Sequence, residues 1–150
     1  LLTNITNEIY SSTSFKINDI LDIKSFYNIQ NGYDMFQSIR HNTKRAFFGM
    51  NENKQIICVS KYWEEVCGYD QEEVAGLKPS FLQGKETNLE VVNNFENSLS
   101  ENGISEAVIV NYTKNNNKFL NNLQVITVNH NDNLETNINT LKYIAEVRVL

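Results

Sequence analysis

Cysteines, basic residues and long apolar runs are all scarce in this 150-residue chain. Its two cysteines, Cys58 and Cys67, are fewer than a disulfide-stapled secreted domain carries, so we expect reduced, buried thiols in an intracellular protein. Lys and Arg number 13 against 18 Asp and Glu. The net charge of -5 argues against direct nucleic-acid contact, because phosphates need clustered cations. No apolar run reaches the roughly 20 residues of a membrane span, and no signal peptide is visible.

Catalytic motifs are scarce as well. The sequence has no glycine-rich phosphate loop and no nucleophile elbow. Its two histidines, His41 and His130, lie in unrelated segments without metal-ligand spacing. Acidic pairs such as Glu64-Glu65 and Glu72-Glu73 fall in short helical segments, which favours a solvated face over a catalytic pair. These features favour a sensor or docking domain over an enzyme and predict no metal site.

The apolar content of 41% is enough for one core. Residues 1–16 are rich in Ser, Thr and Asn, and we expect them to be frayed. Apolar stripes within residues 17–44 predict amphipathic flanking helices, which pair with a partner or pack on their own domain. The main domain is predicted over residues 45–150. Because the chain begins with Leu, we expect it to be a piece of a longer protein.

Strand and helix signals alternate along residues 45–150. Apolar runs at 45–50 and 55–59 flank a polar turn and predict a β-hairpin. Strand-like segments at 104–112, 119–128 and 141–150 close the chain. Between these two groups, capping residues predict helices that begin at Ser60, Asp70 and Thr87, the last with a Thr87/Glu90 capping box. The prediction is an α+β domain, a five-stranded antiparallel sheet with short helices on one face.

Two asparagines are expected to meet on the apolar face of the last hairpin. If its turn centres near Asn116, Asn111 lies opposite Asn121, and Ile109 lies opposite Leu123. A buried amide without a partner costs about 1–3 kcal/mol. The amides can bond each other, ordered water, or a ligand with an amide-like edge such as a flavin or a purine. Local bonding within an Asn-rich protein is the alternative.

These segments resemble the PAS superfamily, and within it the LOV branch of flavin photoreceptors. The resemblance covers about residues 45–150 and is carried by two motifs, Phe81-Leu82-Gln83-Gly84 and Asn111-Tyr112-Thr113-Lys114, with Phe119-Leu120-Asn121 after the turn. It implies the PAS fold, with a pocket between the sheet and the helices and a role in sensing or pairing. It also implies that Gln83, Asn111 and Asn121 would meet the ring of a flavin or another flat ligand.

The chain departs from the LOV pattern where the flavin chemistry is carried out. In LOV domains the loop supplies a cysteine that forms a light-driven adduct with flavin, and the ungapped match places Pro79 there. Lys78 and Ser80 replace the flanking Asn and a phosphate-binding Arg. Glu96 falls where a second phosphate-binding Arg stands, and a carboxylate repels phosphate. The flavin-binding Gln of the last strand matches Val147, although a one-residue shift would place Arg148 there.

The resemblance therefore implies a LOV-like sensory or interaction domain without cysteinyl-flavin photochemistry, in a signalling or transcription-regulatory protein. We expect a homodimer or heterodimer formed through the sheet or the flanking helices, with no membrane contact and no bound cofactor. The alternative is a redox or light sensor that holds a flavin or a small ligand without an adduct. Riboflavin, or another flat ligand without phosphate, is less affected by the substitutions. A nuclear location is expected if the chain belongs to a transcription factor.

Overall fold

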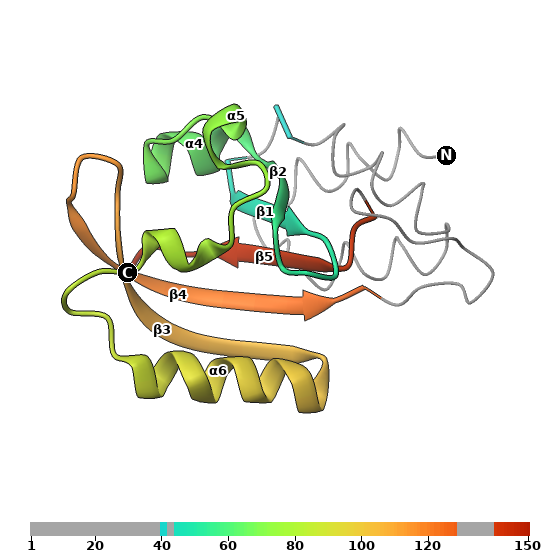
Figure 1. Cartoon of the computed structure of the whole chain (residues 1–150). Helices are drawn as coiled ribbons and strands as arrows, with labels where there is room; N and C mark the ends of the chain where they lie inside the picture. The colour runs from blue at the N-terminus through green and yellow to red at the C-terminus, as the bar shows by residue number, and fades with distance from the viewer. Residues whose placement is uncertain (1–39, 42–43, 129–139) are drawn as a thin grey trace.

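The computed structural model describes residues 40–41, 44–128 and 140–150, so the predicted frayed segment and most of the predicted flanking helices lie outside the described residues. Five antiparallel strands form one sheet in the order β2-β1-β5-β4-β3 (Figure 1). The strands are β1 (Ala46–Met50), β2 (Ile56–Val59), β3 (Ile104–Tyr112), β4 (Lys118–Thr127) and β5 (Tyr143–Val147). The predicted five-stranded antiparallel sheet is thereby confirmed.

Three helices and one 3-10 turn lie between β2 and β3. They are α4 (Lys61–Cys67), α5 (Gln71–Val74), the 3-10 helix η1 (Pro79–Leu82) and α6 (Leu89–Asn102). Ser60 caps α4, because its hydroxyl accepts a hydrogen bond from the Trp63 amide. Gly68 ends this helix in the left-handed conformation that glycine adopts at no steric cost. The start predicted for this helix at Ser60 is confirmed.

The long helix begins one residue later than its sequence suggests. The N-cap of α6 is Asn88, whose Oδ1 accepts hydrogen bonds from the amides of Glu90 and Val91. The Thr87/Glu90 capping box is therefore wrong. The Thr87 hydroxyl instead accepts from the Gly84 amide and donates to the Val110 carbonyl, so it ties the preceding loop to β3.

The core lies between the sheet and the helices. Trp63 and Cys67 of α4, Val74 of α5, Leu82 of η1 and Phe95 and Leu99 of α6 pack against buried strand residues that include Phe48, Ile109, Val125, Ala145 and Val147. Trp63 is fully buried and meets Phe48 edge to face, with ring centroids 6.3 Å apart. Along α6, Phe95 and Leu99 are one helical turn apart and share the face that covers the sheet.

The register of the β3–β4 hairpin differs from the predicted one. Asn121 pairs with Ile109, and Asn111 pairs with Phe119, so the turn centres one residue earlier than predicted. This shift moves each partner by two residues along the strand. Because side chains alternate between faces with a period of two, Asn111 and Asn121 still share the helix-covered face. The predicted opposition of Asn111 and Asn121 is wrong, whereas their predicted common face is right. They are diagonal neighbours.

None of the helices in the described part of the chain is long and apolar enough to cross a bilayer.

Candidate functional site

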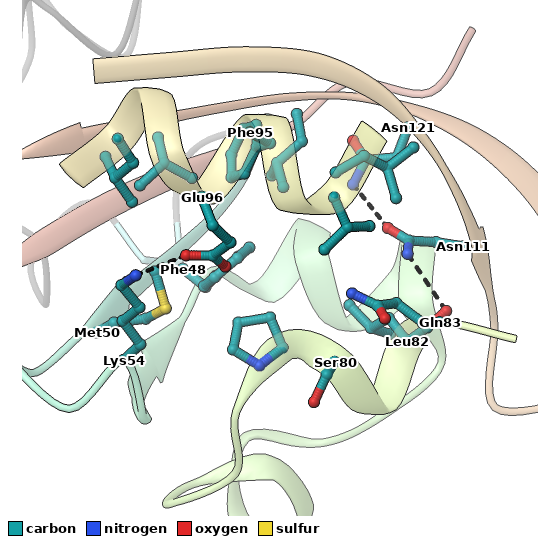
Figure 2. Close-up of a pocket in the computed structure, with 16 residues that line it drawn as sticks. Phe48, Met50, Lys54, Ser80, Leu82, Gln83, Phe95, Glu96, Asn111 and Asn121 are labelled. Atoms are coloured by element: carbon teal, nitrogen blue, oxygen red, sulfur yellow. Dashed lines mark hydrogen bonds and ion pairs between the residues drawn. The ribbon is translucent and has the colours of Figure 1, made fainter. Parts of the chain in front are cut away.

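A pocket of about 80 Å³ opens between α6, η1 and the helix-covered face of the sheet (Figure 2). Its walls are mostly apolar, and its polar groups come from the β1–β2 turn, the η1 segment, α6 and the β3–β4 hairpin. The lining side chains are Phe48, Met50, Lys54, Pro79, Ser80, Leu82, Gln83, Val92, Phe95, Glu96, Leu99, Ile109, Asn111, Asn121, Leu123 and Val125. An apolar chamber with a few polar groups is the usual form of a small-molecule site.

The structure brings six of the eight sequence-predicted site residues together at this pocket: Pro79, Ser80, Gln83, Glu96, Asn111 and Asn121. Lys78 does not line it and is exposed as the residue before η1. Val147 does not line it either, and it is buried in the core cluster of the same sheet face. Arg148, the alternative to Val147, pairs with exposed Glu106 at 2.6 Å. The roles assigned to these residues stay predictions.

Local structure fixes the loop that supplies Gln83. Pro79 opens η1, where its fixed φ and missing amide hydrogen suit the first helical position. After Gln83, the Tyr112 ring lies against Gly84, with no room for a Cβ atom there. The Tyr112 hydroxyl also accepts a hydrogen bond from the Glu86 amide at 3.0 Å. The loop is thus clamped onto β3, which holds the Gln83 side chain at the pocket.

The two hairpin asparagines bond each other. Asn121 Nδ2 donates to Asn111 Oδ1 at 2.9 Å, and Asn111 Nδ2 donates to the carbonyls of Leu82 and Val110 (Figure 2). Asn121 Oδ1 in turn accepts from the Arg148 amide at 3.3 Å. Both side chains are buried. This network is the local bonding considered as the alternative, so the two amides need no ligand to satisfy them.

The mouth of the pocket carries an ion pair that sequence reasoning did not find. Lys54 Nζ lies 2.5 Å from Glu96 Oε2 (Figure 2). Buried Asn51 builds the turn that presents Lys54, because its Oδ1 accepts from the amides of Asn53 and Gln55. Lys54 itself has a positive φ of 60°. The approach of this turn to α6 is a tertiary contact, and the chain has no local pattern that signals it.

Neither cysteine lines the pocket. Cys58 pairs with Gly49 on the sheet face opposite the helices, near Leu141, whereas Cys67 belongs to the core cluster. Burial raises the pKa of the Cys58 thiol to about 12, although a hydrogen bond at Gly49 and the charge of Arg40 oppose it. Burial likewise raises the pKa of the Cys67 thiol to about 12. Both cysteines are buried free thiols, as predicted.

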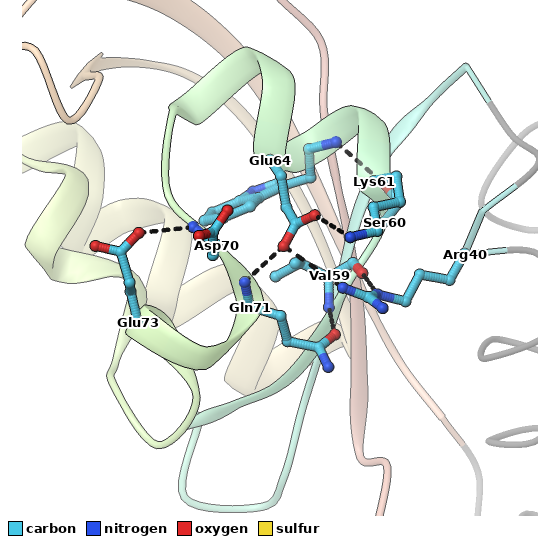
Figure 3. A network of polar contacts seen from close by, with 9 residues as sticks. Arg40, Val59, Ser60, Lys61, Glu64, Asp70, Gln71 and Glu73 are labelled. Atoms are coloured by element: carbon cyan, nitrogen blue, oxygen red, sulfur yellow. Dashed lines mark hydrogen bonds and ion pairs between the residues drawn. The ribbon is translucent and has the colours of Figure 1, made fainter.

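A network of polar contacts covers the outer edge of β2, the edge strand of the sheet (Figure 3). The Val59 amide donates to Gln71 Oε1, and the Val59 carbonyl accepts from Arg40 Nε at 2.7 Å. Glu64 accepts a hydrogen bond from the Gln71 amide at 2.6 Å. Burial pushes the Glu64 pKa upward, but this hydrogen bond and the charges of Lys61 and Arg40 outweigh it and hold the pKa below its usual value. The network fixes α5 and the edge strand together.

A model of the PAS domain family matches residues 44–146. The blue-light photoreceptor of Listeria innocua serovar 6a is 33% identical over 84 residues, which cover 55% of this chain and 33% of that protein. The bacterioopsin transcriptional activator of Halobacterium salinarum is 30% identical over 77 residues, which cover 51% of this chain and 11% of that protein. The chain therefore matches a third or less of the length of these relatives.

Solved LOV domains share the fold. The LOV domain of a blue-light activated histidine kinase of Erythrobacter litoralis aligns with a TM-score of 0.61 and 19% identity, over 71% of this chain and 95% of that one. The light-state structure of the Aureochrome1 LOV domain aligns with a TM-score of 0.60 and 19% identity, over 70% of this chain and 80% of that one. At such low identity the likeness concerns the fold alone.

Proposed function

Because this chain belongs to the PAS domain family, we propose that it is a LOV-like sensory or interaction domain that works without a cysteinyl-flavin adduct. One observation carries the proposal: Pro79 lines the pocket while both thiols lie away from it. Adduct formation needs a sulfur at the ligand, and proline has none. The raised pKa of each buried thiol also leaves little thiolate, which is the reactive form.

The output of such a domain would be contact with another protein chain. Three apolar side chains that belong to β3, β4 and the segment after β5 support this: Val108 is 46%, Leu120 45% and Leu150 69% exposed. The backbone hydrogen bond from Leu150 to Leu120 holds two of them together. Exposed apolar groups of this kind favour association. The names of two relatives, a blue-light photoreceptor and a bacterioopsin transcriptional activator, support a signalling or transcription-regulatory context for this chain.

Sedimentation velocity over a range of protein concentrations tests the association. We expect a dimer that is weakened by Leu120→Glu, because a charge would be buried in the contact. Leu89→Glu is the matched control, since Leu89 is 64% exposed at the start of α6. If the chain stays monomeric at high micromolar concentration, the proposed homodimer is contradicted. If Leu120→Glu and Leu89→Glu weaken the dimer equally, the contact does not lie specifically at Leu120.

A sensor that holds a flavin without an adduct is the second candidate. It is favoured by the convergence of Gln83, Asn111 and Asn121 on one pocket. An absorption spectrum of the purified protein, before and after addition of riboflavin or flavin mononucleotide, distinguishes the two candidates. Colourless protein that takes up neither flavin rules out the second candidate.

Blue-light difference spectra test the loss of adduct chemistry itself. In any flavin-loaded sample, illumination should leave no thiol adduct in the parent protein. The variant Pro79→Cys places a thiol at the pocket wall and is the matched control. A bleached flavin band that recovers in the dark, formed in the parent protein and lost in Cys67→Ser or Cys58→Ser, would overturn the proposal.

A further inference from the structure

The polar side chains of the pocket differ in how many hydrogen bonds they make within the protein. Asn111 and Asn121 bond each other and the backbone, as described above. Gln83 is different: its side chain lines the pocket and is half-buried, and no hydrogen bond joins its amide to another described residue. A half-buried amide with an unused donor and acceptor is the group in this pocket that is best placed to receive a polar atom of a ligand.

The size of the pocket limits what can enter. Sites for drug-sized ligands occupy about 300–1,000 Å³. An engineered protein cavity of about 150 Å³ takes up benzene. This pocket measures about 80 Å³, about half of that cavity, so it holds a body smaller than one ring as it stands and takes a single ring only when its wall moves. Met50, an unbranched and flexible side chain, lies in that wall and can make the adjustment.

Charge at the mouth limits the ligand further. Lys54 and Glu96 are the charged residues among the pocket-lining side chains, and they neutralise each other at 2.5 Å. An anionic ligand gains the attraction of Lys54 only if it displaces Glu96. A cationic ligand likewise gains the attraction of Glu96 only if it displaces Lys54. Behind the mouth lie Phe48, Phe95 and Leu99, where an unpaired charge is strongly disfavoured. An uncharged molecule pays neither cost.

We propose that this pocket binds a small uncharged organic molecule, with a one-ring or shorter apolar body and one carbonyl or amide group directed to Gln83. The Lys54–Glu96 ion pair acts as the specificity element that rejects carboxylates and phosphates. This inference rests on the sensory role of the pocket in the proposed function, and it names the ligand class of that site. In this proposal Glu96 has a defined role: its carboxylate pairs with the Lys54 ammonium group that an anionic ligand would otherwise bind.

Benzamide and benzoate form a matched pair of probes, because they have nearly the same shape and differ in charge at neutral pH. Binding of each to the full chain can be followed by saturation-transfer NMR and by the indole N–H signal of Trp63. That signal is unique, since the chain has one tryptophan, and Trp63 packs on Phe48 in the pocket wall. We expect benzamide to bind at least about tenfold more tightly than benzoate.

Three variants locate the effect. Gln83→Leu should weaken benzamide binding about five- to tenfold, because it removes the polar partner and keeps the size. Glu96→Gln should leave benzamide unchanged and raise the affinity for benzoate about two- to fivefold, because it releases Lys54. Glu101→Gln, an exposed carboxylate of the same helix outside the pocket lining, is the control and should change neither.

The outcomes separate this inference from the proposed function. Benzoate bound as tightly as benzamide, or a Glu96→Gln variant with unchanged selectivity, overturns the role of the ion pair. Benzamide that binds neither the parent protein nor Glu96→Gln overturns the ligand class. In both cases the adduct-free sensory role would stand, because it is tested by flavin spectra and sedimentation. A light-induced adduct in the parent protein would contradict the adduct-free sensory role, whereas the results with benzamide and benzoate would be unaffected.

Discussion

Asn121 Nδ2 donates a hydrogen bond to the side-chain Oδ1 of Asn111 across the β3–β4 hairpin, at 2.9 Å and away from solvent. The two residues are not opposite each other in the register, so a diagonal geometry makes this bond. The pair links the η1 loop to the sheet as well, since Asn111 also donates to the Leu82 carbonyl. The polar end of the pocket is therefore a structural support before it is a ligand contact.

Each single substitution in this asparagine pair should lower the free energy of unfolding by more than half of the loss caused by the double substitution. Asn111→Leu leaves the buried Asn121 amide without its acceptor, and we expect a loss of about 1–3 kcal/mol in the free energy of unfolding. Asn121→Leu should cost a similar amount. The double substitution should cost less than the sum, because neither asparagine side chain is then left without the other. Urea unfolding of the four proteins measures the coupling, and additive losses would contradict a direct bond.

A methyl group at position 84 should destabilise the fold through the Tyr112 ring. A Cβ at Gly84 would overlap Cε2 and Cδ2 of Tyr112, whose hydroxyl is held by the Glu86 amide. We expect Gly84→Ala to lower the free energy of unfolding by about 1–3 kcal/mol. The same substitution in a Tyr112→Ala background should cost much less, since the ring is absent. Thermal or urea unfolding checks this, and an equal cost in both backgrounds would point to the backbone instead.

The stabilising effect of Glu64 should depend on pH. Its pKa is lower in the folded chain than in the unfolded chain, so the carboxylate contributes its full stabilisation above the unfolded-state pKa. That stabilisation is lost as the pH falls through the folded-state pKa. We expect Glu64→Gln to cost about 1 kcal/mol near neutral pH and progressively less in acid. The exposed neighbour Glu65, changed to Gln, is the control. A cost that does not vary with pH in urea titrations would contradict the assignment.

Both thiols should resist alkylation while the domain is folded. Burial raises the pKa of Cys58 and of Cys67 to about 12, and neither side chain is exposed. With iodoacetamide near neutral pH, mass spectrometry should show no modification of the native protein and two modifications after denaturation. Rapid labelling of one thiol in the native state would show that its segment opens easily.

The chain's own sequence determined the five strands and the start of α4. The Ser60 cap and the left-handed Gly68 are local devices, so α4 was predictable from adjacent residues. The common face of Asn111 and Asn121 followed from strand alternation, which survives a two-residue change of register. The pairing itself did not follow, because the position of the Asn-rich turn depends on backbone geometry that several asparagines can adopt.

Only the tertiary structure decided how the pocket is closed. Lys54 and Glu96 are 42 residues apart, and their contact exists because the β1–β2 turn reaches α6. Thr87 left its expected capping role because the Val110 carbonyl, supplied by β3, offered a partner that no local pattern contains. The volume of the pocket is likewise set by how α6 and η1 pack on the sheet. Local sequence encodes the elements, whereas contacts between distant segments set the size and the charge of the site they enclose.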